Sequence, residues 1–291
     1  MRKLQMRKQF RAYGAFLIML ISTGFAAEPK VDPALTAITD RPSLPRVLLI
    51  GNSISIAYTL PVRALLADVA NVHRIPANGG ATTIGLRDLE RWLGEGHWDV
   101  IHFNFGLGDL RHVFPGNKVQ NEKGEYPRPG EGAPRVPLNA YENNLRTLIN
   151  RLKATGAQVI FATTTPLKDD FHGYFAGHEL SYNDVARKIV EETGIRLNDL
   201  HSVVVARCPE LQVDHVHFNT EGNRQLAQSV AASIRAALTA PVMTGWPADK
   251  AKEYLELKPS QAGLRTELAI TLARLSAAAR PVPRHYEFIR L

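Results

Sequence analysis

Short apolar runs alternate with stretches of helical periodicity along most of the chain beyond residue 45. The apolar runs predict strands at residues 46–50, 73–77, 100–103, 158–163 and 195–198. Between them, apolar residues recur every three or four positions and predict helices at residues 60–69, 84–93, 138–153, 182–192 and 220–238. Strict alternation of strand and helix is typical of a parallel sheet covered by helices on both faces. In such sheets, binding sites form in the crevice beyond the carboxyl ends of the strands.

The first 27 residues have a different pattern. Five basic residues and no acidic one precede an apolar stretch that runs from Ala12 to Phe25 and is followed by Ala26 and Ala27. This order is typical of a secretory signal peptide that is cleaved after Ala26 or Ala27. The apolar stretch is shorter than the roughly 20 residues of a typical transmembrane helix, which disfavours a retained anchor. We therefore expect a signal peptide at residues 1–27 and no stable membrane insertion after its cleavage.

The rest of the chain divides into three parts. A Pro-rich lead (residues 28–45) precedes the α/β domain (residues 46–240), and a tail with helical stretches but no recognisable chemistry follows (residues 241–291). Within the domain, the connections at residues 111–137 and 164–179 are unusually long and lack periodicity. Long connections inside a compact domain are commonly functional. Because both should border the crevice, we expect them to contact substrate, the alternative being solvated insertions.

Composition and charge exclude several classes of protein. The 291 residues are 45% hydrophobic and 22% charged, so the chain can bury a sizeable core and is unlike a disordered protein. The formal net charge is +7, but five basic residues lie in the predicted signal peptide, which leaves +2 on the mature chain. The sequence lacks the basic stripe with interleaved aromatics of nucleic-acid-binding proteins, so no nucleic-acid partner is expected. Cys208 is the only cysteine, and no intrachain disulfide can form.

Three residues from distant parts of the chain suggest acyl-transfer chemistry. Ser53 lies on a turn after the first predicted strand, and Asp214 and His217 lie just before the last predicted helix. A serine hydroxyl is a weak nucleophile at neutral pH, so it requires an imidazole to accept its proton and a carboxylate to orient that imidazole. Asp and His three residues apart on a turn can hydrogen-bond directly, so one loop can supply both groups.

Each of these residues also has another interpretation. Ser53 could only cap the following helix, and His217 could be a buried structural histidine. Asp214, His215 and His217 could bind a metal ion, because residues two apart on an extended segment point the same way. No further cluster of His, Cys or carboxylate residues supports a metal at this spacing, so we expect neither a metal nor a cofactor. We also expect His215 to point away from Ser53.

Four short segments share their order and spacing with a known family. They are Gly51-Asn52-Ser53, Asn78-Gly79-Gly80-Ala81-Thr82, Gly106-Leu107-Gly108-Asp109 and Asp214-His215-Val216-His217. The first three each follow a predicted strand, and together the four resemble the sequence blocks of the SGNH/GDSL hydrolase family over roughly residues 46–238. The resemblance implies a three-layer α/β/α, flavodoxin-like sandwich with about five parallel strands.

The resemblance also implies hydrolysis of esters or thioesters through an acyl-enzyme. By position, Ser53 would be the nucleophile, His217 the general base and Asp214 the residue that holds the imidazole in the right tautomer. The backbone N–H groups of Ser53 and Gly80 would bind the oxyanion. Gly79 replaces Gly80 in this role if the alignment slips by one residue.

The chain departs from the family at two positions. Asn52 replaces the usual acidic residue of the first block, which is generally a supporting element, so we expect it to be tolerated. Gly108 stands where the family has the Asn that supplies the third oxyanion donor, and loss of one donor can cost on the order of 10² to 10³ in rate. We expect His112 in the substrate site to replace it, with Asn104 and His102 as alternatives. If the third donor is missing, Gly108→Asn should raise the rate; if His112 already fills the space, the added side chain should collide with it and lower the rate.

The sequence thus predicts a bacterial serine ester hydrolase that is secreted or periplasmic and deacylates carbohydrate or small acyl esters. One alternative is a catalytically impaired relative that binds glycan, motivated by Gly108. The other is a lipase or thioesterase of the same fold, which an apolar crevice lined by loop aromatics would favour. These aromatics are Phe114, Phe171, Tyr174 and Phe175.

Overall fold

The computed structural model describes residues 32–239. The predicted signal peptide (residues 1–27) and the tail (residues 241–291) lie outside the described residues, as do the first residues of the Pro-rich lead. The described part of the lead contains a short 3₁₀ helix, η1 (Pro33–Leu35), which is capped by the side chain of Asp32. Over residues 32–239, none of the helices is long and apolar enough to cross a membrane.

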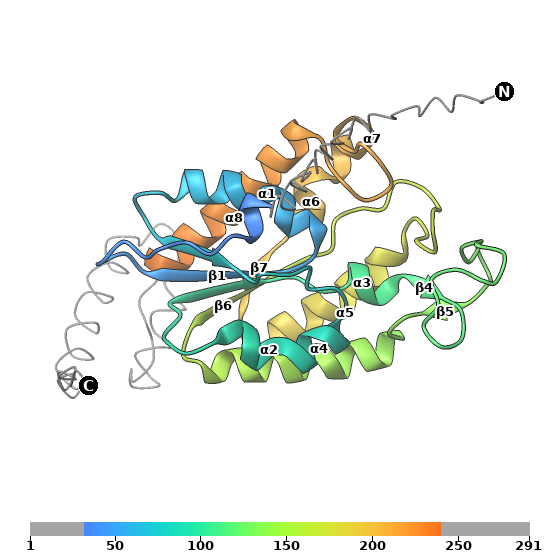
Figure 1. The fold of residues 1–291 in the computed structure, drawn as a ribbon, viewed down its shortest axis with the longest axis horizontal. Coiled ribbons are helices and arrows are strands. Elements are labelled where there is room, and N and C mark those ends of the chain that lie inside the picture. Colours follow the sequence, from blue (N-terminus) through green and yellow to red (C-terminus); the bar gives the residue numbers. More distant parts are fainter. Residues whose placement is uncertain (1–31, 240–291) are drawn as a thin grey trace, which may run out of the picture. The chain divides into compact units, whose positions relative to one another are not determined.

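Five parallel strands form the central sheet (Figure 1). In chain order they are β1 (Arg46–Ile50), β2 (Asn71–Arg74), β3 (Val100–Phe103), β6 (Gln158–Ala162) and β7 (Arg196–Asn198). Their spatial order is β2-β1-β3-β6-β7, and every pairing is parallel. This is the flavodoxin-like order, which reverses between β1 and β3 and places the crevice there. The predicted fold is confirmed.

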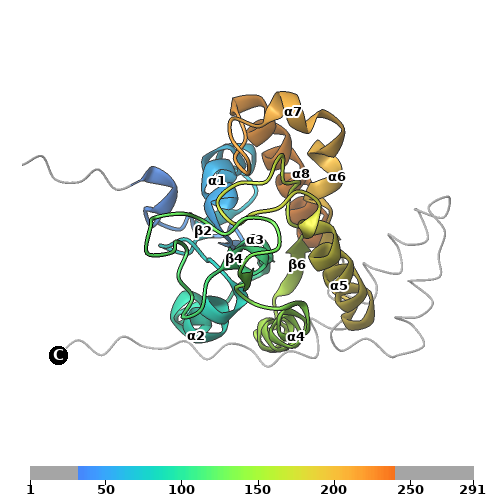
Figure 2. The ribbon, with the colours of Figure 1, turned by 90° about the vertical axis from the view of Figure 1, so that its right-hand side faces the viewer.

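Helices cover both faces of the sheet (Figures 1 and 2). α1 (Ser53–Leu65) and α8 (Thr220–Thr239) pack side by side on one face. The other face is covered by α2 (Thr82–Leu93), α4 (Leu138–Ala154) and α5 (His178–Thr193). Four of the five predicted helices agree with these bounds to within about one turn.

The first helix was predicted at residues 60–69, and its start was wrong. α1 begins at Ser53, because the side chain of Asn52 accepts a hydrogen bond from the Ile54 N–H at 3.0 Å and caps the helix directly after β1. Pro61 lies inside α1 and removes one hydrogen-bond donor from it. Burial of the face that includes Ile54 and Tyr58 holds the helix against the sheet.

Short elements account for most of the remaining differences from the prediction. The second strand was predicted at residues 73–77 but ends at Arg74, whose guanidinium turns back to donate to the carbonyls of Ile75 and Ala77, both at 2.7 Å. Elements of two to five residues have too few positions to show a period. Besides η1, the unpredicted ones are α3 (Leu107–Leu110), β4 (His112–Val113), β5 (Ala133–Pro134), α6 (Leu200–Val204), η2 (Val205–Arg207) and α7 (Cys208–Leu211).

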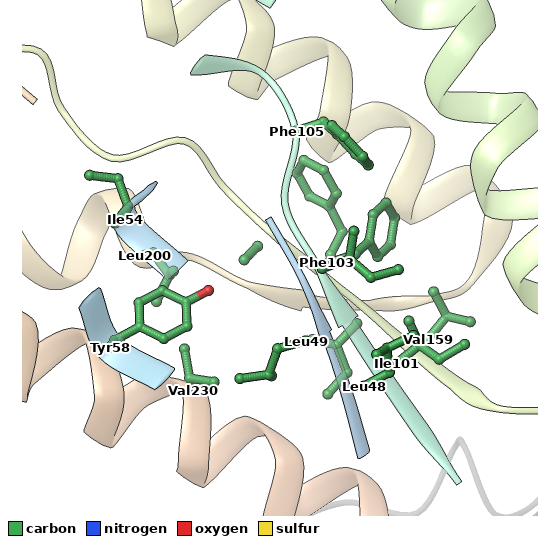
Figure 3. Packing of buried hydrophobic residues seen from close by; sticks show 14 of the residues in the cluster. Leu48, Leu49, Ile54, Tyr58, Ile101, Phe103, Phe105, Val159, Leu200 and Val230 are labelled. Carbon is green, nitrogen blue, oxygen red and sulfur yellow. The ribbon is translucent and has the colours of Figure 1, made fainter. Parts of the chain in front are cut away.

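Side chains from β1 and β3 form the centre of the hydrophobic core (Figure 3). Tyr58 of α1 and Val230 of α8 lie on one side of these strands, and Phe103 and Phe105 lie on the other. Phe103 packs edge-on against Phe161 of β6, with 5.3 Å between the ring centroids. The core therefore fixes β1 and α1, which flank the turn that leads to Ser53 (the nucleophile turn), and also the neighbouring strand β3.

His102 is a buried base in the middle of this core. Asn198 accepts a hydrogen bond from the Ser229 hydroxyl at its Oδ1 and therefore points its Nδ2 at His102 Nε2, 3.1 Å away. The imidazole Nε2 thus accepts a hydrogen bond from the Asn198 amide. Protonation of Nε2 is disfavoured, because the added proton would point at the N–H group of that amide. Burial lowers the pKa of His102 from 6.5 to about 4. His102 supports the core and lies within the sheet.

This environment makes a contribution to stability that is lost in acid. Between the unfolded pKa of 6.5 and the folded value of about 4, the unfolded chain binds a proton that the folded chain rejects, so stability falls as the pH falls. We expect the unfolding free energy to decrease by about 2 kcal/mol from this residue between pH 7 and pH 5. Urea unfolding at both pH values should show a smaller decrease for His102→Leu than for the natural chain. The exposed His97 provides the control: His97→Leu should keep the full decrease, and equal decreases in all three proteins would contradict the assignment.

Candidate active site

The first turn of the crevice presents Ser53 at the start of a helix. β1 ends at Ile50, the chain turns through Gly51 and Asn52, and α1 begins at Ser53. The first N–H groups of a helix have no acceptor within the helix, so the Ser53 N–H is free to bind a ligand. Gly51 allows a close approach here, because a Cβ at this position would lie 2.8 Å from Ser55 Oγ.

The structure brings Ser53, His217 and Asp214 into one hydrogen-bonded chain. Ser53 Oγ lies 2.8 Å from His217 Nε2, and His217 Nδ1 lies 2.7 Å from Asp214 Oδ2. A carboxylate can only accept, so Nδ1 carries the proton of the neutral ring and Nε2 is left to accept from the serine hydroxyl. This is the tautomer that a general base next to a serine nucleophile requires.

The loop before α8 holds Asp214 ionised. Its Oδ1 accepts hydrogen bonds from the backbone N–H groups of Val216 at 2.8 Å and His217 at 2.7 Å. Partial burial acts to raise the pKa of Asp214, but these N–H groups and the His217 side chain outweigh it and lower the pKa to about 2. Asp214 is therefore a carboxylate throughout the neutral and mildly acidic range.

The second turn of the crevice lies directly against the first. The Gly79 N–H donates to the Gly51 carbonyl at 2.8 Å, which excludes Gly79 as an oxyanion donor because its only N–H is already used. The Gly80 N–H faces the exposed side-chain oxygen of Asn78 at 3.1 Å, a contact that a substrate oxyanion can replace. Of the two predicted alternatives, the geometry favours Gly80.

The third turn explains why position 108 has no side chain. A Cβ on Gly108 would lie 2.5 Å from both the carbonyl carbon and the oxygen of Gly80, and 2.7 Å from the nitrogen of Ala81. A side chain at position 108 therefore requires the Gly80 turn or α3 to move, so the structure disfavours the expectation that Gly108→Asn would raise the rate. The side chain at position 108 would thus collide with Gly80, the residue whose N–H is the candidate oxyanion donor, and not with His112.

Asp109 fastens the second and third turns together. Its Oδ1 accepts from the Thr82 N–H at 2.8 Å, and its Oδ2 accepts from the Gly106 N–H at 3.1 Å. The carboxyl is fully buried, and this burial raises its pKa to about 6 despite the hydrogen bonds. Asp109 thus ties the start of α2 to the start of α3.

Arg74 fastens the first turn to the end of β2. The buried guanidinium donates to the carbonyls of Gly51 at 2.9 Å and Asn52 at 3.2 Å, and to Ser55 Oγ at 2.8 Å. Burial lowers the pKa of Arg74 to about 10, so it remains charged at neutral pH. The role of Arg74 could not be predicted from the sequence, because an arginine within a strand belongs to no motif.

A cleft of about 290 Å³ opens above Ser53. Both long connections border it, as predicted, and contact with substrate stays a prediction. Its lining residues are Ser53, Leu107, Arg111, Phe171, His172, Tyr174, Asp214, His215, Val216 and His217. Two of the four loop aromatics that favoured a lipase, Phe114 and Phe175, are not among them.

His215 belongs to this lining, contrary to the expectation that it points away. Its ring stacks on Phe171 with 3.6 Å between centroids and 16° between planes. The metal interpretation of Asp214, His215 and His217 gains no support, since over residues 32–239 no group of three or more His, Cys, Asp or Glu residues is arranged to hold an ion.

The three candidates for a third oxyanion donor lie elsewhere. His112 contacts the Glu131 carbonyl at 3.1 Å through Nδ1 and packs edge-on against Phe175, with 4.7 Å between ring centroids. Burial lowers the pKa of His112. Asn104 donates to the carbonyl of Ala162 at 2.7 Å, and His102 lies within the sheet. Within the described part of the chain, none of the three lines the cleft.

Comparisons with known proteins agree with this geometry. The family model for GDSL-like lipases/acylhydrolases matches residues 49–225. The structure is similar to an acetyl xylan esterase, AlAXEase, with a TM-score of 0.52 and 19% identity over 65% of this chain and 99% of that one. It is also similar to a lipase/acylhydrolase from Enterococcus faecalis, with a TM-score of 0.53 and 17% identity over 66% and 96% of the two chains. An acetylxylan esterase from Geobacillus stearothermophilus has a TM-score of 0.51 and 20% identity over 65% and 94%.

At these identities the similarity to solved structures shows the fold alone. No curated protein sequence matches the chain significantly. The family match covers more than half of the chain and includes all four turns that form the crevice. The chain therefore belongs to the GDSL-like lipase/acylhydrolase family, the SGNH/GDSL hydrolases.

Proposed function

We propose that this protein is a serine carboxylic-ester hydrolase that works through an acyl-enzyme. The observation that carries the proposal is the hydrogen-bonded chain from Ser53 Oγ to His217 Nε2 and from His217 Nδ1 to Asp214, at 2.8 and 2.7 Å. In such an arrangement, Ser53 Oγ attacks the ester carbonyl while its proton passes to His217. Collapse of the tetrahedral intermediate then releases the alcohol, which takes that proton.

The second half of the reaction repeats these steps with water. His217 removes a proton from water, the resulting hydroxide attacks the acyl-Ser53 carbonyl, and the carboxylic acid leaves as the serine regains its proton. The N–H groups of Ser53 and Gly80 donate to the oxyanion in both halves. No metal or cofactor takes part in these steps.

The size and polarity of the cleft support short acyl groups. Its volume of about 290 Å³ is at the small end of ligand pockets, which span about 300 to 1,000 Å³. Arg111, three histidines and Asp214 make much of its wall polar. A long acyl chain would leave most of its apolar surface in water, so the acetyl-type substrate is favoured over the lipase alternative. The acetyl xylan esterases among the similar structures share only the fold, and the choice rests on the cleft.

Export and a carbohydrate ester complete the proposal. The signal peptide pattern at residues 1–27 favours a secreted or periplasmic protein. A polar cleft bordered by two long loops suits a bulky external substrate, such as an acylated polysaccharide. Amino-terminal sequencing of the protein recovered outside the cytoplasm should give a chain that starts at Glu28 or Ala27.

The chain that begins at residue 28 is expected to hydrolyse p-nitrophenyl acetate with a kcat/KM at least about 10-fold above that for p-nitrophenyl laurate, because the longer acyl chain exceeds the cleft. Steady-state rates across acetyl, butyryl, octanoyl and lauroyl esters measure this. A maximum at lauroyl would favour the lipase alternative. Absence of hydrolysis of every ester by the folded protein would favour the glycan-binding relative.

A further inference from the structure

Arg111 places a guanidinium in the wall of the cleft. It follows α3 directly and lines the same cleft as Ser53. Its Nε donates to the His172 carbonyl at 3.0 Å, and its charge faces the rings of Tyr174 at 5.1 Å and Tyr126 at 5.7 Å. The group is therefore held in a fixed position by one neutral acceptor and two aromatic faces.

A second arginine, Arg135, is a neighbour of Arg111. The Arg135 N–H donates to the Arg111 carbonyl at 2.8 Å, so the two residues are neighbours across the base of the long connection. The Arg135 side chain donates to neutral acceptors only, the Asn117 amide at 2.9 Å and the Gly108 carbonyl at 3.3 Å. Burial and the nearby charge of Arg111 both lower the pKa of Arg135. Two like charges thus influence each other, and one of them lines the same cleft as Ser53.

Within residues 32–239, neither guanidinium forms an ion pair with a carboxylate. Half-buried arginines elsewhere in the protein do, as in the pairs Arg46–Asp40, Arg146–Glu142, Arg151–Glu90 and Arg187–Asp199. Arg63 and Arg74 have no carboxylate partner either, but three and five hydrogen bonds, respectively, occupy their donors. Arg111, in contrast, donates from Nε to the His172 carbonyl and otherwise contacts the ring of Tyr174, and it lines the cleft.

The carboxylate of the third turn and that of the loop before α8 are already engaged. Asp109 is buried and accepts from Thr82 and Gly106, and Asp214 accepts from the His217 ring and from two backbone N–H groups. The charge of Arg111 is therefore available to a ligand. A planar guanidinium with free N–H groups binds a carboxylate through paired, charge-assisted hydrogen bonds.

Resting on the ester hydrolysis proposed above, we propose that the substrate carries a carboxylate in addition to its ester, and that Arg111, supported by the charge of Arg135, binds it. Arg111 is a specificity-determining residue in this account. An O-acetylated uronic acid has this chemistry on the alcohol side, and a dicarboxylic acid monoester has it on the acyl side.

Two matched substrate pairs test the proposal. The alcohol-side pair is an O-acetylated methyl galacturonoside and the corresponding galactoside, and the acyl-side pair is p-nitrophenyl hemisuccinate and p-nitrophenyl butyrate. We expect the natural chain to prefer the anionic member of at least one pair by roughly 10-fold or more in kcat/KM. Arg111→Gln should reduce that ratio by a similar factor, Arg111→Lys by less, and added salt should reduce it in the natural chain.

Arg128 is the matched control, since it is an exposed arginine of the same connection that does not line the cleft. Arg128→Gln should leave the ratio unchanged. A preference for the neutral member of both pairs, or a ratio that Arg111→Gln leaves unaltered, would overturn the proposal while ester hydrolysis stands.

If the natural chain hydrolyses no ester, binding measurements test the carboxylate site instead. Calorimetric titration compares methyl galacturonoside with methyl galactoside, and succinate with butyramide, and the anionic member of at least one pair should bind more tightly. Equal binding within both pairs would reject the carboxylate site.

Discussion

Ser53→Ala is expected to lower kcat/KM for p-nitrophenyl acetate by roughly 10⁴-fold or more while leaving the protein folded. The hydroxyl is the only atom group removed, and its hydrogen bond to His217 Nε2 at 2.8 Å identifies it as the group whose proton the imidazole takes. His217→Ala should cause a similar loss, because a serine without a base is a weak nucleophile at neutral pH. Initial rates together with thermal unfolding measure both effects.

The double variant gives the sharper test. If the two side chains act as one unit, Ser53→Ala with His217→Ala should be no slower than either single variant. Asp214→Asn should be less damaging than loss of the serine, since it disturbs the imidazole's tautomer and orientation but leaves the nucleophile in place. Ser181 lies exposed on α5, and Ser181→Ala should have no effect. Turnover that survives Ser53→Ala would reject the proposed nucleophile.

Gly108→Asn is expected to lower kcat/KM by at least about 10²-fold, the range associated with loss of one oxyanion donor. The new Cβ would lie 2.5 Å from the carbonyl group of Gly80, so either α3 or the Gly80 turn must move. Movement of that turn displaces the N–H proposed to bind the oxyanion. It also strains the contacts of the adjacent Asp109 with Thr82, so the melting temperature should fall.

Two further variants separate sterics from chemistry. Gly108→Ala adds only the Cβ and should reproduce most of the loss, because the collision occurs at that atom. Gly124→Asn introduces the same side chain on a loop where a Cβ meets nothing within 4 Å, and it should leave the rate unchanged. A rate that rises in Gly108→Asn but falls in Gly108→Ala would contradict this account and restore the idea of a missing donor.

The strands and helices that could be predicted are those long enough to show a run or a period of apolar residues. Apolar runs such as residues 46–50 and 100–103 predicted strands that the structure confirms, because both faces of a parallel sheet are buried and the runs are continuous. The start of α1 was missed because one side-chain hydrogen bond from Asn52, which has no period, decides it. The end of β2 coincides with Arg74, whose side chain donates to the Gly51 carbonyl of another turn. Such a tertiary contact leaves no pattern in the sequence.

The candidate active site also has some features that the sequence predicts and others that depend on contacts in the folded chain. Ser53 lies at the carboxyl edge of the sheet because it follows β1 directly, and its pairing with His217 was proposed from the residue types and the resemblance to the SGNH/GDSL hydrolases. The choice between Gly79 and Gly80 required a hydrogen bond that only the folded chain shows. The steric reason for Gly108 could not be predicted, because it depends on the backbone of another turn, which approaches position 108 only in the folded chain.

The hydrogen bonds of Arg74 affect which substitutions the nucleophile turn can accumulate. Four of its five acceptors are backbone carbonyls, which every residue type presents. These contacts do not depend on the side chain at position 52, whose own role is to cap α1, which Asn and Asp can both do. A lysine at position 74 would not reproduce this support, because one ammonium cannot span the fork of a guanidinium. Much of the support for the nucleophile turn thus comes from the neighbouring strand β2, through Arg74.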